Sequence, residues 1–393
     1  MGPPHNPATY IRGINRVNVF RRSRLLNKGG KVGLSWATIP VFILLFGFIV
    51  LIHEGGHFIC ARLFGVTVHE FSIGIGPAVV RTKRKGVVYS LRLIPFGGFV
   101  KVAGMEIMLE GEAAVPQPGE RLFNELSCGK KVLMMLSGPL NNLLCALLTF
   151  IFIAAVLGLP VQLQSDRAVI GFVEPNSPSY EAGLAAGDEI VAINGQPITH
   201  WTQLSGLVHQ AANQRLRMEF KRAGRYFVRE LTPVYDATLG VARIGIHPAY
   251  VVERLPLPKA IQYGVTLTGR QIVAIPVSIV QMLTGRMRPQ FVGPIGMVGM
   301  IDQALKTGLY LFFTMVASFN LFLGIFNLLP IPLPLLDGGW IVIFLLEWLR
   351  GSEFKPEHKI VAQGIGLVLI IAFYFTVVSA DLTSVLRRLM LKS

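Results

Sequence analysis

The chain has 393 residues, of which 52% are hydrophobic and only 15% are charged, and its mean hydropathy is +0.54. Soluble domains carry about 25% charged residues, so this composition excludes an ordinary soluble protein and indicates a polytopic membrane protein with room for one or two soluble pieces. The net charge of +15 is not accompanied by a nucleic-acid motif, and the basic residues cluster beside apolar runs, which indicates a lipid bilayer and no nucleic-acid partner.

The chain begins with a basic segment and continues into a long apolar run. Residues 1–35 contain many Arg and Lys and no acidic residue, which predicts a basic N-terminal flank at a membrane face. The run from Trp36 to about Phe64 is long enough to cross a hydrocarbon core about 30 Å thick. We therefore expect the first transmembrane helix here.

Three ionisable residues, His53, Glu54 and His57, lie near the far end of this run. Residues four apart share one face of a helix, so the two imidazoles can hold one metal ion, with Glu54 beside them as a candidate base. The alternative is a pair of core histidines satisfied by hydrogen bonds, which hydrocarbon disfavours because it offers no water. Gly55 and Gly56 leave this face open to close approach by another backbone or by a substrate.

Short β segments follow the first helix. Residues 87–94 alternate in polarity after a turn at 83–86, and Pro95, Phe96, Gly97 and Gly98 follow them. This pattern predicts a β-hairpin associated with the membrane. Its edge strand either pairs with an extended peptide or belongs to an ordinary connecting sheet. Residues 105–125 are expected to form a polar loop.

The second spanning run extends from Val132 to about Pro160. Asn141 and Asn142 lie within it and need partners at membrane depth, so we expect them to face the protein interior. The first two transmembrane helices and the hairpin loop thus occupy residues 36–160.

Residues 165–236 differ in kind, because short strand-like pieces alternate with turns around one helical stretch. They predict one water-soluble α+β domain, and the core Ala-Gly-Leu-Ala-Ala-Gly-Asp-Glu-Ile at 182–190 resembles that of a PDZ domain. PDZ folds bind extended peptides or chain ends by adding a strand. The alternative is a steric filter that binds no peptide.

Residues 237–305 are expected to form a linker in which 260–283, interrupted by Arg270 and Pro276, is an amphipathic or surface helix. Residues 306–393 are expected to contain the last two transmembrane helices, at 310–329 and at about 361–378. The fold class is therefore a polytopic α-helical membrane protein with about four transmembrane helices, a β-hairpin and one inserted α+β domain.

Between the last two helices, Asn327 precedes three prolines at alternate positions, and Asp337 heads a new helix. Asp337 is either a helix cap or, given the two histidines, a metal ligand.

With these motifs the chain resembles the site-2 protease family of intramembrane zinc metalloproteases, and within it the PDZ-bearing, RseP-like bacterial branch. The stretches that carry the resemblance are residues 53–58, 71–74, 94–101, 137–140, the PDZ-like core, 293–295 and 327–339. The resemblance implies one Zn²⁺ ion held by His53, His57 and Asp337, with Glu54 as the base. It also implies cleavage of single-span membrane proteins in signalling, in a multi-pass protein of the bacterial inner membrane rather than of an organelle.

A helical substrate hides its carbonyls in its own hydrogen bonds and must unwind before it is cleaved. We expect the hairpin with Gly97 and Gly98 to hold the unwound strand, and Asn142 and Asn327 to bind its freed backbone groups. The chain departs from the family pattern by two additional residues between Asn327 and Asp337, by Trp340 where His or Arg is usual, and by a single PDZ-like domain.

Two alternatives and one conflict accompany this interpretation. A catalytically silent scaffold would use only the PDZ-like domain, and a transporter with a metal site would usually show an internal repeat, which the chain lacks. The family places the zinc near the cytoplasmic face and the N-terminus outside. Residues 1–35 and 65–131 are both basic, however, and a single span cannot place both on the same side.

Overall fold

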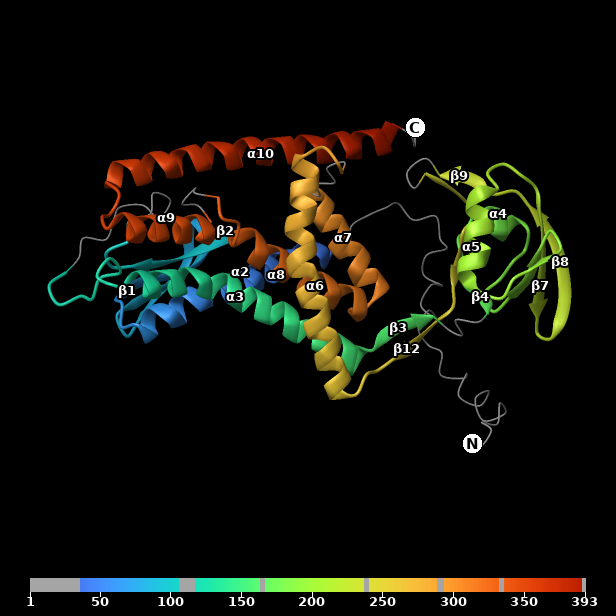
Figure 1. Ribbon diagram of the computed structural model, residues 1–393, viewed down its shortest axis with the longest axis horizontal. Helices are drawn as coiled ribbons and strands as arrows, with labels where there is room; N and C mark the ends of the chain where they lie inside the picture. The colour runs from blue at the N-terminus through green and yellow to red at the C-terminus, as the bar shows by residue number, and fades with distance from the viewer. Residues whose placement is uncertain are drawn as a thin grey trace. The chain divides into compact units, whose positions relative to one another are not determined.

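The computed structural model in Figure 1 describes residues 36–105, 117–162, 167–236, 240–287, 293–331 and 336–390. The described chain divides into a helical unit, residues 36–157 and 255–390, and an inserted unit, residues 158–254. The expected basic flank at 1–35, most of the polar loop at 105–125 and two of the three prolines before Asp337, Pro332 and Pro334, lie outside the described residues.

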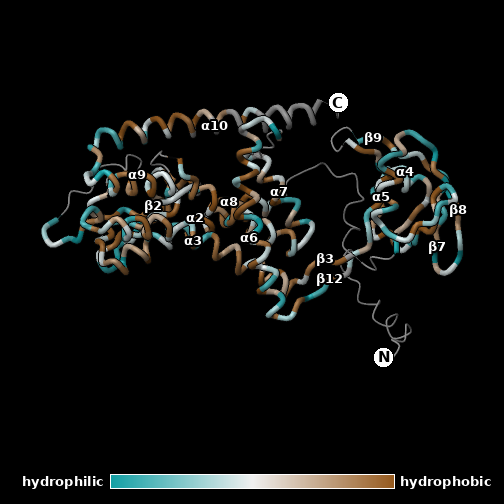
Figure 2. The backbone as a smooth tube through the Cα atoms, viewed as in Figure 1, coloured by the Kyte–Doolittle hydropathy of each residue, from teal (hydrophilic) through white to brown (hydrophobic). Residues whose placement is uncertain are grey.

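The helical unit is built around one central helix, α3 (Cys128–Phe152), which contacts α2, α6, α8 and α9. Apolar residues dominate α2, α3 and α8, as the brown segments in Figure 2 show. The other helices are α2 (Thr38–Leu63), the π-helical continuation of α3 named η4 (Ile153–Leu157), α6 (Leu257–Leu283), α7 (Pro294–Thr307), α8 (Leu309–Asn327), α9 (Asp337–Arg350) and α10 (Pro356–Met390). Within the described residues, α2, α3 with η4, α6 and α8 are long and apolar enough to cross a membrane.

Helix α6 is among these four candidates, although the sequence pattern predicted an amphipathic or surface helix there. Arg270 and Pro276 lie inside α6 without ending it. Gly264 brings α6 close to α3, because an ideal Cβ at this position would lie 2.6 Å from Cγ1 of Ile151. The predicted last span, 361–378, falls within α10, whose side chains are described only in part, and it stays a prediction.

Strands β1 (Val68–Arg84) and β2 (Val87–Val102) form the predicted β-hairpin around a turn at Lys85 and Gly86, both at positive φ. Each of these two long strands contributes two segments to the sheet. Residues 70–73 of β1 pair with 98–101 and also with 88–91 of β2, whereas residues 78–84 pair with 87–92. Segments 98–102 and 78–84 are therefore the two outer edges of this sheet, as far as the structure describes it.

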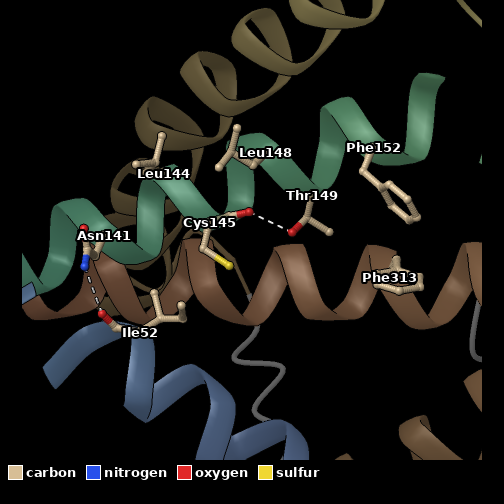
Figure 3. Close-up of a pocket in the computed structure, with 8 residues that line it drawn as sticks. All are labelled: Ile52, Asn141, Leu144, Cys145, Leu148, Thr149, Phe152 and Phe313. Carbon is tan, nitrogen blue, oxygen red and sulfur yellow. Dashed lines mark hydrogen bonds between the residues drawn. The ribbon is translucent and has the colours of Figure 1, made fainter. Parts of the chain in front are cut away.

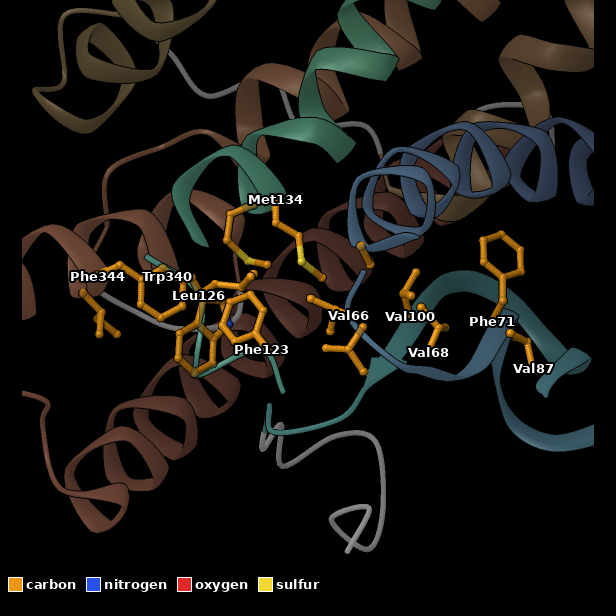
Figure 4. Close-up of a cluster of buried hydrophobic side chains, with 14 residues drawn as sticks. Val66, Val68, Phe71, Val87, Val100, Phe123, Leu126, Met134, Trp340 and Phe344 are labelled. Carbon is orange, nitrogen blue, oxygen red and sulfur yellow. The ribbon is translucent and has the colours of Figure 1, made fainter. Parts of the chain in front are cut away.

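A cluster of buried apolar side chains joins the hairpin to α2, α3 and α9 (Figure 4). Val68 and Phe71 come from β1, Met134 comes from α3, and Trp340 and Phe344 come from α9. The rings of Trp340 and Phe344 stack with centroids 5.5 Å apart. The tryptophan that departs from the family pattern thus packs in this core, and the packing holds the first turn of α9 beside α2 and α3.

The inserted unit contains a sheet with strand order β11-β4-β5-β7-β8, and β6 pairs with β5. Its core includes Ile170, Ile190, Leu204 and Phe220. The elements of the sheet and its helices are β4 (Ala168–Val173), β5 (Glu189–Ile193), β6 (Gln196–Pro197), β7 (Leu216–Arg222), β8 (Arg225–Leu231), β11 (Ile246–Pro248), α4 (Pro178–Glu181) and α5 (Trp201–Gln210).

Two further strand pairs complete the inserted unit, β9 (Val234–Asp236) with β10 (Val241–Arg243) and β3 (Leu159–Gln162) with β12 (Tyr250–Glu253). Strand β11 pairs with β4, so the sheet continues beyond residue 236, where the sequence pattern had placed the end of the domain. A three-residue edge strand carries too little periodicity to be recognised in a sequence.

Candidate metal centre

Helix α2 carries His53, Glu54 and His57 in its last three turns, and all three are buried. The two histidines are four residues apart and therefore project from the same face of the helix. Their ring centroids are 5.0 Å apart with an angle of 81° between the ring planes. The helical periodicity thus places the two imidazoles side by side, with Glu54 on the adjacent position.

Asp337, the first residue of α9, lies against both imidazoles. Its Oδ2 is 3.2 Å from Nε2 of His53, and its Oδ1 is 3.4 Å from Nε2 of His57. The two Nε2 atoms are 3.4 Å apart. In the described part of the chain, these three residues form the group of His, Cys, Asp or Glu side chains whose donor atoms lie close enough to hold a metal ion.

The arrangement fits a zinc ion on three grounds. In a tetrahedral zinc site the ligand atoms lie roughly 3.3 Å from one another, because each is about 2.0 to 2.1 Å from the metal. The separations of 3.2, 3.4 and 3.4 Å are close to that value, and the first two end on different oxygens of Asp337. With one donor atom taken from each residue, all three atoms lie within 4.8 Å of one another. Two imidazoles and one carboxylate are a donor set that zinc prefers, and three protein ligands are the number found in catalytic sites.

A hydrogen bond from His57 supports the same interpretation. Nδ1 of His57 donates to the backbone carbonyl of Met134, at 2.8 Å. In the neutral ring this bond places the proton on Nδ1 and leaves the lone pair of Nε2 directed at His53 and Asp337. The lone pair of His57 then faces Nε2 of His53 and the carboxylate of Asp337 in a buried site, an arrangement that a cation between them would stabilise.

Two glycines allow α2 and α3 to approach closely at this site. An ideal Cβ at Gly56 would lie 2.2 Å from the carbonyl oxygen of Ser137, and one at Gly138 would lie 2.3 Å from Nε2 of His57. The prediction that a glycine between the histidines admits another backbone holds for Gly56, whereas Gly55 faces open space. The sequence analysis gave Gly138 and the Met134 carbonyl no part in the metal centre; a glycine before a proline inside a spanning run was the available signal.

The residues expected to bind substrate lie in different surroundings. Nδ2 of Asn327 is 3.3 Å from Nε2 of His53, so Asn327 lies at the centre itself. Asn142 is fully buried, and neither polar atom of its amide has a hydrogen-bond partner among the described residues. Gly97 has φ 87°, and an ideal Cβ at Gly98 would lie 2.9 Å from Cγ of Glu54. The structure thus brings Asn327 and Gly98 to the histidine turn, whereas Asn142 lies on α3.

A groove of about 410 Å³ begins at Ile52, next to His53, and runs along α3 (Figure 3). Asn141 lines it and donates its amide to the carbonyl oxygen of Ile52, at 3.2 Å. Thr149 also lines it and donates to the carbonyl of Cys145. Because both polar side chains are satisfied within the chain, the groove presents an apolar surface beside the histidine turn.

Residues 41–373 match the model of peptidase family M50. A relative from Clostridium acetobutylicum is 30% identical over 349 residues, which cover 88% of this chain and 98% of that protein. Zinc metalloprotease RasP of Bacillus licheniformis and regulator of sigma-W protease RasP of Bacillus subtilis are 26% and 25% identical over 419 residues, with the same coverage of 88% and 98%. The PDZ domain of an SdrC-like protein from Listeria monocytogenes matches 23% of this chain and 94% of its own, with 20% identity and a TM-score of 0.20.

Proposed function

The chain belongs to peptidase family M50 and is an intramembrane zinc metalloprotease, and we propose that His53, His57 and Asp337 hold its zinc ion while Glu54 moves the protons. The observation that carries the proposal is the convergence of two imidazole nitrogens and one carboxylate, from α2 and α9, within 4.8 Å of one another. Family membership disfavours the silent-scaffold alternative.

When bound there, zinc supplies a Lewis acid that activates a water molecule and polarises the scissile carbonyl. Glu54, which follows His53 on the same helix, is the side chain that would accept a proton from water and return it to the leaving amine. The bond from His57 to Met134 fixes the ring orientation throughout, and Asp337 contributes the negative charge that favours a cation in this buried site. Close packing of α2 on α3 at Gly56 and Gly138 fixes the position of His57 relative to α3.

We propose that the substrates of the enzyme are single-span membrane proteins whose transmembrane segment unwinds against the hairpin, a proposal that the match to the peptidase family supports. Segment 98–102 pairs on one side with residues 68–73, and Gly98 lies next to Glu54. An extended peptide added to the other side of this segment would therefore run past the catalytic base. Asn327 and the unpartnered amide of Asn142 supply polar groups for the carbonyls and N–H groups that unwinding releases.

We also propose that the inserted unit is a PDZ-like domain that accepts an extended peptide or chain end, and that the protein is a multi-pass component of a bacterial inner membrane. The Ala-Gly-Leu-Ala-Ala-Gly-Asp-Glu-Ile motif and the edge position of β11 support the first point. The bacterial relatives and the four apolar helices support the second.

The experiment that tests the catalytic assignment is Glu54→Gln, assayed on a panel of single-span membrane proteins. We expect cleavage to fall by about 10²-fold to 10⁴-fold, since the variant lacks the general base. The zinc content and thermal unfolding of the variant should match those of the parent, because the ligands remain. Chelator treatment of the parent, followed by zinc addition, serves as the control for metal dependence. A variant that cleaves at the parent rate would remove Glu54 from the mechanism.

A further inference from the structure

A buried ionic cluster lies inside the hairpin sheet and takes no part in the chemistry described above. Its centre is Glu70 of β1, of which 8% is exposed. Oε1 of Glu70 accepts a hydrogen bond from Ser90 Oγ at 2.6 Å and one from Arg92 Nη2 at 2.7 Å. Oε2 accepts a third from Arg81 Nη2 at 3.2 Å. Charge-assisted bonds of this kind are short and directional, so the carboxylate fixes the strands that donate to it.

Arg92 extends this cluster across the sheet. Its Nε donates to Oγ of Ser72 at 2.9 Å, and its Nη1 donates to the carbonyl of Gly76 at 2.7 Å. Its guanidinium also lies over the ring of Phe99, 5.0 Å from the centroid. A single side chain on the inner segment 87–92 therefore contacts the segment 70–76 and the edge segment 98–102.

The edge segment has no spare room beside the active site. An ideal Cβ at Gly98 would lie 2.6 Å from the carbonyl oxygen of Ser72, 2.7 Å from Cγ1 of Val50 and 2.9 Å from Cγ of Glu54. Ser72 therefore accepts a hydrogen bond from Arg92 through its side chain, and its backbone carbonyl packs against Gly98. A displacement of the segment that carries Ser72 must move Gly98 relative to Glu54.

We propose that Glu70 and Arg92 are positioning residues of the peptidase, which hold the edge segment 98–102, and with it the substrate strand, in register with Glu54. The inference rests on the proposed function, in which the substrate pairs with this edge and Glu54 is the base. Three nitrogen atoms of Arg92 donate to three separate acceptors, on Ser72, Gly76 and Glu70. The single ammonium group of a lysine cannot reproduce this planar arrangement of donors.

The charge state of Glu70 agrees with this role. Burial by itself raises the pKa of this carboxyl, but the hydrogen bonds from Ser90 and Arg92 and the charges of Arg92 and Arg81 outweigh it and hold the pKa below the ordinary value. Glu70 therefore stays ionised at neutral pH, and the cluster remains intact in the range where the enzyme would be assayed.

The test compares Glu70→Gln, Arg92→Gln, Arg92→Lys and the Glu70→Gln/Arg92→Gln double variant, with Arg84→Gln as matched control. Arg84 lies on the same strand as Glu70 and is exposed. The readouts are kcat and KM for a single-span substrate, zinc content, and hydrogen exchange of the amides of residues 98–102 in the full-length protein.

We expect each Glu70 and Arg92 variant to lower kcat by about 10-fold to 100-fold, because misplacement of a substrate by about 1 Å costs that much. KM should change by less than about 3-fold, and the double variant should be no worse than either single variant, because the two residues act as one unit. Exchange at 98–102 should speed up while zinc content stays at the parent level. Arg92→Lys should not restore kcat, and Arg84→Gln should behave as the parent.

Parent kcat in Glu70→Gln and Arg92→Gln would overturn the proposal, and so would a loss of kcat with unchanged exchange at 98–102. If these variants fail to fold, Ser72→Ala removes one acceptor of Arg92 and gives the same comparison with a smaller change. The proposed function fails separately, through activity in Glu54→Gln. Inactive Glu54→Gln together with fully active Glu70 and Arg92 variants would leave the peptidase assignment standing and remove only the positioning role.

Discussion

Asp188 of the inserted unit and Asp337 of the helical unit are both largely withdrawn from solvent, with 1% and 15% of the side chain exposed, yet their partners are opposite in kind. Asp188 accepts from Nε and Nη2 of Arg222 at 2.6 and 2.7 Å and from the backbone N–H of Ala185 at 2.8 Å. Its charge is balanced and its oxygens are saturated by neighbours in the same unit. These bonds also hold the pKa of Arg222 above its ordinary value.

Asp337 faces the Nε2 atoms of two imidazoles instead, and at least that of His57 has no proton to donate in the neutral ring. Buried polar groups are normally paired, and Oδ2 of Asp337 has no hydrogen-bond partner among the described residues, so a cation held between the three side chains would satisfy it. Burial of a carboxylate alone therefore does not identify a functional site. What separates the two aspartates is whether the chain itself supplies the opposite charge.

The strongest test of this difference is Asp337→Asn, which keeps the size of the side chain but removes its charge. We expect zinc to be lost at micromolar free metal and cleavage to fall by about 10³-fold or more, because two imidazoles alone bind zinc weakly. Without zinc, thermal unfolding of the metal-free variant should differ little from that of the metal-free parent. Metal analysis and cleavage of a single-span substrate are the measurements. Full zinc occupancy in the variant would show that Asp337 is not a ligand.

The sequence predicts the two halves of this site unequally, for a physical reason. His53, Glu54 and His57 are related by helical periodicity, which is local and therefore visible in a single sequence. Asp337 is linked to them only through tertiary packing, and neither composition nor spacing reports that Trp340 and Phe344 hold α9 beside α2. The residue pattern left Asp337 as either a helix cap or a metal ligand, and the family resemblance named it as the third ligand.

The same reason explains what the sequence does not show in the fold. Alternation predicts that 87–94 is a strand but not that residues 70–73 pair on both sides, because register depends on where the strands bend. The contacts of Gly138 with His57 and of Arg92 with Ser72 likewise join residues that are far apart in the sequence, so no local pattern reports them. Helix α6 was expected at the surface because Arg270 and Pro276 lower its apolar character; its length and composition make it a candidate span, and Arg270 is exposed.

The reciprocal change is Asp188→Asn, which removes the charge that balances Arg222 in the inserted unit. We expect the inserted unit to lose about 2 kcal/mol of stability, since a charge-assisted pair is replaced by weaker neutral bonds and Arg222 stays partly exposed. Hydrogen exchange of β4, β5 and β7 in the full-length protein measures the loss, and the exposed Glu181→Gln is the control. Zinc content should remain at the parent level. If zinc content fell instead, the two aspartates would not be independent, and the contrast between them would fail.

Two adjacent glycines on the metal-binding turn provide a matched pair of variants. Gly56→Ala places a Cβ against the carbonyl oxygen of Ser137, which is backbone and cannot rotate away, so α2 and α3 must separate. Overpacking of this kind costs about 1 to 3 kcal/mol, and a shift of His57 relative to Asp337 should also lower zinc affinity.

Gly55→Ala meets nothing within 4 Å and should stabilise α2 by up to about 1 kcal/mol, because alanine favours helix over glycine. Thermal unfolding and zinc titration of the two variants separate the effects of helix propensity and of close approach. Equal behaviour of the two would mean that the contact between α2 and α3 does not set the geometry of the centre. A loss of zinc affinity confined to Gly56→Ala would tie the position of His57 to the approach of α3, rather than to the helical turn that the two glycines share.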